Sequence, residues 1–149
     1  MQAIEGYEQR VRDSFGRQGA MGLLGAVLGR IEPGTVEIEL PFRPELTQQH
    51  GFFHAGMVAT VADSAGGYAA YSVFPADASV LTVEFKVNLI APADGERVRA
   101  VGQVIRSGRT LTVCELRAYV YKSGRETQCL HGMSTLMCMV GKSDGPKAA

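Results

Sequence analysis

The segment 51–74, in the middle of the chain, is apolar and contains a single charged side chain, Asp63. It is rich in Gly and Ala, and Pro75 follows it directly. Its length would suffice to span a membrane. An Asp at the centre of a spanning helix costs about 2.5–3.5 kcal/mol, and the chain has no second segment of this kind. The segment therefore predicts a buried helix over 54–74 in a globular domain, ended by Pro75.

The sequence after this helix alternates between apolar and polar residues or is rich in β-branched ones, as strands are. Strands are expected at 80–90, 97–106, 110–121 and 128–140, with a hairpin turn at 107–109 and further turns at 91–96 and 122–126. No helical pattern interrupts these segments. Consecutive strands joined by short turns predict an antiparallel sheet.

The sequence before the central helix supplies the other elements. Residues 2–15 place apolar side chains at helical spacing, and 35–40 alternate as a half-buried strand after a turn at 32–35. The order of elements predicts an α+β fold in which one long helix lies on an antiparallel sheet. A single domain is expected over 1–140, and 141–149 are expected to be a disordered tail.

Composition narrows the class of protein. The chain has 149 residues and a formal net charge of zero, which argues against a nucleic-acid-binding surface. Its amino terminus lacks the basic-then-apolar order of a secretory signal. The three cysteines, Cys114, Cys129 and Cys138, form no CxxC pair. They are read as buried free thiols, which predicts a protein of the reducing cytoplasm. Neither a membrane nor a nucleic-acid partner is expected.

Asp63 is the strongest candidate for a catalytic group. A carboxylate in an apolar helix is costly unless something pairs with it or uses it. At about 100° per residue, its neighbours on the helix face are small, which allows a backbone or a ligand to approach the acid. These neighbours are Gly56, Ala59, Thr60, Gly67 and Ala70. The bulkier Met57, Val58, Val61 and Tyr68 lie on the other side and are expected to face the sheet.

The start of the helix is the second candidate. Free N–H groups at Ala55, Gly56 and Met57 would be able to polarise a carbonyl. His54 precedes Asp63 by nine residues, or about 900° and 13.5 Å along a helix, so the helix start and the acid cannot meet in one chain. The sequence therefore predicts a site between two subunits, in a homodimer or a homotetramer.

Two stretches carry a family resemblance. Residues 48–63, from Gln48 through His54-Ala-Gly to Asp63, and residues 81–93 resemble the hot-dog thioesterases of the phenylacetate-degradation (PaaI-like) type. In that family an Asn precedes a His-Gly-Gly segment by six residues, and an acid follows on the helix. The resemblance covers about residues 20–140. It implies a hot-dog fold, one central helix wrapped by an antiparallel sheet, and hydrolysis of acyl-coenzyme A thioesters without a cofactor or a metal.

The resemblance also implies roles for single residues. Asp63 matches the catalytic acid, and Ala55 matches the residue whose N–H polarises the thioester carbonyl. Gln48 stands where the family has Asn. His54 and Gly56 flank Ala55 in the substrate-binding segment, and Thr82 matches a hydroxyl near the acid. Basic loop residues often meet coenzyme A phosphates in hot-dog proteins, which suggests Arg106 and Arg109; solvated turn charges explain them equally well.

Several alternatives stay open. A non-catalytic acyl-coenzyme A sensor and a hot-dog hydratase are the rival functions, and Asp63 favours the thioesterase. A metal site at His50 and His54 is disfavoured because no Glu follows His50. Cys129 and His131 share one strand face by alternation, which allows a nucleophile pair.

The pocket is expected to take aryl or medium-chain acyl groups. Its expected lining is Leu46, Phe52, Phe53, Met57 and Tyr68.

Overall fold

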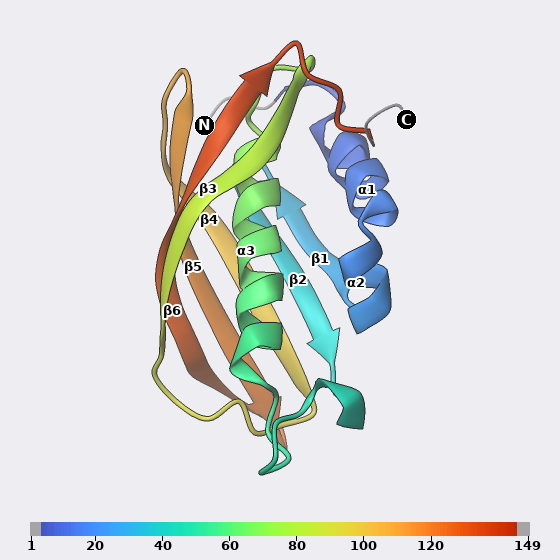
Figure 1. Ribbon diagram of the computed structural model, residues 1–149, viewed down its shortest axis with the longest axis vertical. Coiled ribbons are helices and arrows are strands. Elements are labelled where there is room, and N and C mark those ends of the chain that lie inside the picture. Colours follow the sequence, from blue (N-terminus) through green and yellow to red (C-terminus); the bar gives the residue numbers. More distant parts are fainter. Residues whose placement is uncertain (1–3, 146–149) are drawn as a thin grey trace.

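A computed structural model describes residues 4–145 and shows one long helix held in a curved antiparallel sheet (Figure 1). The six strands lie in the order β1-β2-β4-β5-β6-β3, and each neighbouring pair is antiparallel. The helices are α1 Tyr7–Arg17, α2 Gly19–Leu24, the short 3-10 turn Pro44–Leu46 and α3 Ala55–Tyr71. The strands are β1 Val27–Glu32, β2 Thr35–Pro41, β3 Ala78–Leu89, β4 Arg97–Ser107, β5 Leu111–Lys122 and β6 Arg125–Val140. The predicted α+β hot-dog arrangement is confirmed.

Helix α3 lies very close to the sheet because both partners carry small residues at the contact. A side chain at Gly102 of β4 would come within 2.3 Å of the backbone of Ala65 and Gly66. Only glycine at position 102 allows this approach. The buried face of α3 presents Val58 and Val61 to the core, together with Tyr68. Val58 and Val61 therefore face the core as expected, and Met57 is only half-buried. Tyr68 is buried, but its hydroxyl contacts Ser14 and Gln18 near α1 instead of the sheet.

The end of α3 differs from the prediction. The helix ends at Tyr71, before Pro75 is reached. Arg10 of α1 donates hydrogen bonds to the carbonyls of Tyr71 and Phe74, and the Ser72 hydroxyl donates to the Ala69 carbonyl. These bonds satisfy carbonyl groups that a longer helix would have paired.

The amino-terminal helix is shorter than expected. Its first turn begins at Tyr7 rather than at residue 2, after Gly6, which has a left-handed backbone at φ 73°. Residues 2–3 of the predicted helix lie outside the described part of the chain. A second short helix, α2, then leads into β1, which the sequence had left undefined within 21–31.

The expected tail begins with residues that contact the domain. The Gly141 N–H donates to the carbonyl of Asp77, and the Asp144 carboxylate pairs with Arg17 at 2.7 Å. Disorder therefore does not describe 141–145. It stays a prediction for 146–149, which lie outside the described residues.

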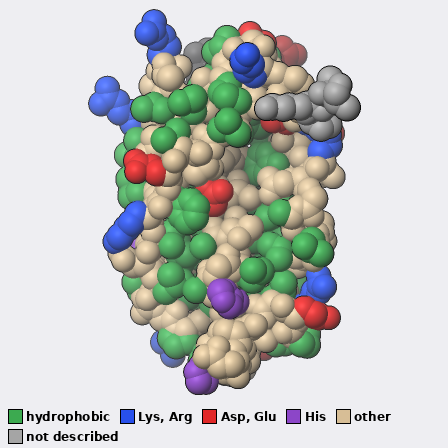
Figure 2. All heavy atoms as spheres, viewed as in Figure 1, with side chains coloured by type: hydrophobic (Ala, Val, Ile, Leu, Met, Phe, Trp, Pro, Cys, Tyr) green, Lys and Arg blue, Asp and Glu red, His purple; other side chains and the backbone are tan. Residues whose placement is uncertain are grey.

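One face of the molecule is apolar and open to solvent. Hydrophobic side chains gather over α3 and β3 in Figure 2, beside a hollow in the surface. β3 is an edge strand, and most of its residues are exposed. The exposed apolar residues of β3 and the residue after it are Leu81, Val83, Phe85, Leu89 and Ile90. Across residues 4–145, no helix has the length and apolar character needed to cross a membrane.

Candidate active site

Asp63 lies half-buried on the side of α3 that the sheet leaves open. The Thr82 hydroxyl of β3 donates a 2.9 Å hydrogen bond to the Asp63 carboxylate. Burial raises the pKa of Asp63 above its ordinary value, and the Thr82 hydrogen bond opposes this increase. Among the described side chains, no Lys, Arg or His pairs with this acid. Asp63 is thus a desolvated carboxylate with one hydrogen-bond donor, as a general base or nucleophile requires.

The sequence predicts that the small residues on the Asp63 side of α3 are open to an approaching backbone or ligand. Most of them are partly exposed, as this requires. Gly56, Ala59, Thr60 and Gly67 are all partly exposed, whereas Ala70 is fully buried. The open stripe therefore runs from the helix start to about one turn beyond Asp63. It ends before the helix does because α1 covers the last turns.

The start of α3 offers fewer free N–H groups than expected. His54 caps the helix: its Nδ1 accepts a 2.9 Å hydrogen bond from the Gly56 N–H. The Met57 N–H donates to the His54 carbonyl at 2.9 Å. Of the three predicted donors, only the Ala55 N–H has no acceptor among residues 4–145. The structure thus corrects the prediction for Gly56 and Met57 and leaves Ala55 as the donor at the positive end of the helix dipole.

A cavity of about 510 Å³ opens at this helix start. Its walls include Ala55, Gln48 and two of the predicted aromatic residues, Phe52 and Phe53. Gln48 lies in the loop before the helix, where its side-chain oxygen accepts from the His50 N–H. The structure therefore brings Gln48 and Ala55 together. Leu46 and Met57 do not line this cavity, and Tyr68 lines a different one.

Asp63 faces its own, smaller cavity of about 220 Å³. Thr82, Val80 and Leu81 of β3 form one wall, and α3 forms another. Asp63 follows Ala55 by eight residues, a rise of about 12 Å along the helix. The acid and the free N–H therefore open into separate cavities of the same chain.

The cavity beside Asp63 has walls that the sequence did not reveal. Ser14, Gln18 and Asp144 line it, although they come from the two ends of the chain. Gln18 donates to the Tyr68 hydroxyl at 3.1 Å and accepts from the Ser64 hydroxyl at 3.0 Å. No local sequence signal identifies these residues, because only the tertiary fold brings them to α3.

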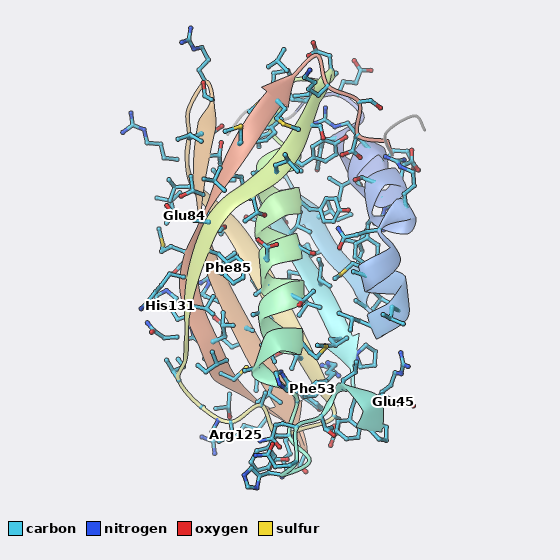
Figure 3. The ribbon with its side chains drawn as sticks, viewed as in Figure 1. Glu45, Phe53, Glu84, Phe85, Arg125 and His131 are labelled. Atoms are coloured by element: carbon cyan, nitrogen blue, oxygen red, sulfur yellow. The ribbon has the colours of Figure 1, made fainter. Side chains whose placement is uncertain are left out.

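Arg106 and Arg109 lie at the turn between β4 and β5, at the opposite end of the molecule from the start of α3 (Figure 1). Both are exposed. The basic residues near the helix start are instead Lys122 and Arg125, at the turn between β5 and β6. Figure 3 shows Arg125 and Phe53 at this same end. Within one chain, the structure does not bring Arg106 and Arg109 to the Ala55 cavity.

The cysteines do not form a nucleophile. The register shifts between β5 and β6 at a bulge, so Cys129 points inward while His131 points outward and contacts Glu115. The expected shared face of Cys129 and His131 is therefore wrong. Burial raises the pKa of Cys129 to about 11 and that of Cys114 to about 12. All three cysteines are free and buried, as predicted.

Comparison with known proteins identifies the family of this chain. The family model of the thioesterase superfamily matches residues 50–127, which is more than half of the chain and includes Ala55 and Asp63. The chain belongs to the thioesterase superfamily. It is a PaaI-like hot-dog thioesterase and a thioester hydrolase.

Three similar proteins show the extent of the likeness. A thioesterase family protein from Silicibacter pomeroyi is 51% identical, with a TM-score of 0.90 over 91% of this chain and 100% of that chain. The proofreading thioesterase EntH of Klebsiella pneumoniae is 26% identical over 76% of this chain and 82% of its own. The Escherichia coli PaaI protein is 14% identical, and its TM-score of 0.83, over 94% and 98% of the two chains, shows a shared fold.

Proposed function

We propose that this thioesterase hydrolyses aryl- or medium-chain acyl thioesters of coenzyme A at a site shared between two subunits. The observation that carries the proposal is the separation of Asp63 from Ala55 on one helix. A carboxylate with a raised pKa and a helix-start N–H are the two groups needed to attack and polarise a thioester carbonyl. Eight residues of helix keep them apart in one chain, so a second chain has to supply one of them.

A two-fold axis supports this arrangement. If the axis passes near Ala59, midway between the two groups, each Asp63 faces Ala55 of the partner subunit. The residues around Ala59 are small and partly exposed, which allows two helices to approach closely. The exposed apolar edge strand β3 lies beside α3 and would be covered in the same dimer. A dimer is therefore the minimal active unit, and two dimers can pair into a tetramer.

The reaction follows from these groups. The N–H of Ala55 of the partner subunit holds the carbonyl oxygen, with Gln48 beside it, and stabilises the negative charge that develops there. Asp63 removes a proton from water, whose oxygen attacks the carbonyl carbon; the C–S bond then breaks, and the thiolate leaves and takes up the proton. In the alternative route, the Asp63 carboxylate attacks first and water releases the acyl group. Neither route requires a cofactor or a metal.

The two cavities suit the two parts of the substrate, the acyl group and the coenzyme A moiety. The cavity beside Asp63 has about 220 Å³, and a cavity of about 150 Å³ accepts benzene. An aryl or medium-length acyl group therefore fits there. The Ala55 cavity continues past Phe52, Ala91 and Pro92 into a surface groove, which suits the longer coenzyme A arm.

Two further aspects belong to the proposal. In a dimer with a two-fold axis near Ala59, the β4–β5 hairpin of one subunit lies close to the start of α3 in the partner subunit. The first subunit is the one that supplies Asp63 to this site. Arg106 and Arg109 would then meet the phosphates of coenzyme A.

The free thiols suit a reducing compartment, and we place the enzyme in the cytoplasm.

Thiol release from a panel of coenzyme A thioesters tests the reaction. We expect benzoyl, phenylacetyl and medium-chain acyl thioesters to have higher kcat/KM than acetyl and succinyl ones. Asp63→Asn should lower kcat by at least about 10², a typical scale for the loss of a general base. The matched control is Asp13→Asn, because Asp13 is exposed on α1. Unaltered hydrolysis by Asp63→Asn would remove this acid from the mechanism.

Mixing two inactive variants tests the shared site. Asp63→Asn lacks the acid, and Ala55→Pro lacks the N–H donor. A mixed dimer contains one site with both groups intact, so activity should return to about one site per mixed dimer. Native mass spectrometry counts the mixed dimers, and circular dichroism confirms that each parent folds. Mixed dimers that form and stay inactive would contradict the shared site.

A further inference from the structure

The carboxyl-terminal segment of the same chain lines the cavity beside Asp63 through Asp144. At one end, Thr82 of β3 donates its hydrogen bond to Asp63. At the other end, Ser79 of the same strand donates to the Asp144 carboxylate at 3.3 Å. Three residues of β-strand separate Ser79 from Thr82, a distance of about 10 Å. The cavity therefore extends along β3 from the proposed catalytic acid to Asp144.

Asp144 is held in this place by contacts from two other parts of the chain. Arg17, which ends α1, donates a 2.7 Å hydrogen bond to its carboxylate. The segment that carries Asp144 is fixed at its beginning by the Gly141 N–H, which donates to the carbonyl of Asp77. The Asp144 side chain is only 20% exposed. It therefore forms a wall of the cavity and does not project into solvent.

The polar groups at the Asp144 end of the cavity disfavour the binding of a long alkyl chain. The cavity has aliphatic surface near Asp63, at Val80 and Leu81, and polar groups elsewhere, at Ser14, Gln18 and Tyr68. The Asp144 carboxylate accepts hydrogen bonds from Arg17 and Ser79 and can accept more from water. An alkyl chain that reached Asp144 would collide with the side chain or displace this water, and loss of hydration at a charged group is unfavourable. Acyl groups that end before Asp144 avoid both penalties.

We propose that Asp144 is a specificity-determining residue that closes the far end of the acyl pocket and sets the upper length of the acyl group. The inference rests on the proposed function, in which Asp63 attacks the thioester and the acyl group occupies this cavity. Arg17 is the positioning residue that keeps Asp144 at the end of the pocket. Removal of either side chain opens the pocket toward solvent along α1.

The test compares acyl lengths in three variants of the full-length enzyme. Asp144→Ala removes the wall, Arg17→Ala removes its positioning partner, and deletion of residues 142–149 removes the whole segment. The substrates are hexanoyl, octanoyl, decanoyl and dodecanoyl thioesters of coenzyme A. Each additional buried methylene is worth about fourfold in affinity. We therefore expect the ratio of dodecanoyl to hexanoyl kcat/KM to rise by about tenfold or more in each variant.

Controls separate this inference from the proposed function. Asp13→Ala, the matched control, removes an exposed Asp of α1 that lines no described cavity and should keep the wild-type profile. A wild-type enzyme that hydrolyses the panel, with variants that keep its length profile, overturns the role of Asp144 alone. An equal loss at every length overturns it too, because Asp144 would then serve folding or catalysis. A wild-type enzyme that cleaves no coenzyme A thioester overturns the proposed function and the inference with it.

Discussion

The Thr82 hydroxyl donates a 2.9 Å hydrogen bond to the Asp63 carboxylate, and this contact opposes the effect of burial on the pKa of the acid. Asp63 has to be ionised to act as a base or a nucleophile, so kcat/KM should fall as the pH drops through its pKa. Thr82→Val removes a bond that lowers this pKa. We expect the acidic limb of the pH–rate profile to move to higher pH in this variant.

Thr82→Ser is the matched control, because it keeps the hydroxyl and should keep the wild-type limb. The measurement is kcat/KM between about pH 4 and pH 9 with one acyl thioester. Coincident acidic limbs for Thr82→Val and the wild type would show that the titration of Asp63 does not govern the rate.

Burial of Asp63 should also reduce the stability of the folded protein at neutral pH. The pKa of this acid is raised above 3.8, so the folded state keeps the proton in a range where the unfolded chain has lost it. Stability is therefore fully retained below the unfolded pKa and falls as the pH rises through the folded pKa. Asp63→Asn should be more stable than the wild type near pH 7, and the difference should shrink toward about pH 4. Urea unfolding across this range measures it; a constant difference would contradict the pKa shift.

His54 should contribute to folding through its contact with Gly56. Its Nδ1 caps α3, and loss of a capping side chain costs about 1 kcal/mol. We expect His54→Ala to lower the free energy of unfolding by about this amount, and His54→Asn to restore most of it. His50→Ala is the control, because the His50 side chain does not cap the helix. Equal stability of His54→Ala and the wild type would show that the cap is not needed.

The phosphates of coenzyme A give a test of the basic residues. Arg106→Ala/Arg109→Ala should raise KM for coenzyme A thioesters and leave KM unchanged for pantetheine thioesters, which lack the nucleotide. Lys122→Ala/Arg125→Ala changes the other exposed basic turn and is the comparison. An increase in KM confined to the second pair would assign the phosphates to the β5–β6 turn instead.

The fold was predictable because one pattern dominates the chain. A long apolar helix followed by alternating segments has few packing solutions. The helical phase of His54 and Asp63 predicts a site between two subunits, and this stays a prediction. The start of α3 was harder, because a capping histidine occupies the Gly56 N–H. The bulge that turns Cys129 away from His131 leaves no signal in an alternating pattern. The sequence places Asp144 in a tail, because the contact of Asp144 with Arg17 joins opposite ends of the chain and leaves no local pattern.

The placement of Asp63 and Ala55 on one helix has a consequence for enzyme activity in dilute solution. If neither subunit holds a complete site, specific activity depends on the dimer dissociation constant and falls when the enzyme is diluted below it. An excess of chains that lack Asp63 would trap wild-type chains in dimers with half of the sites. In a cell, the amount of this hydrolase would then set its turnover per molecule as well as its total rate.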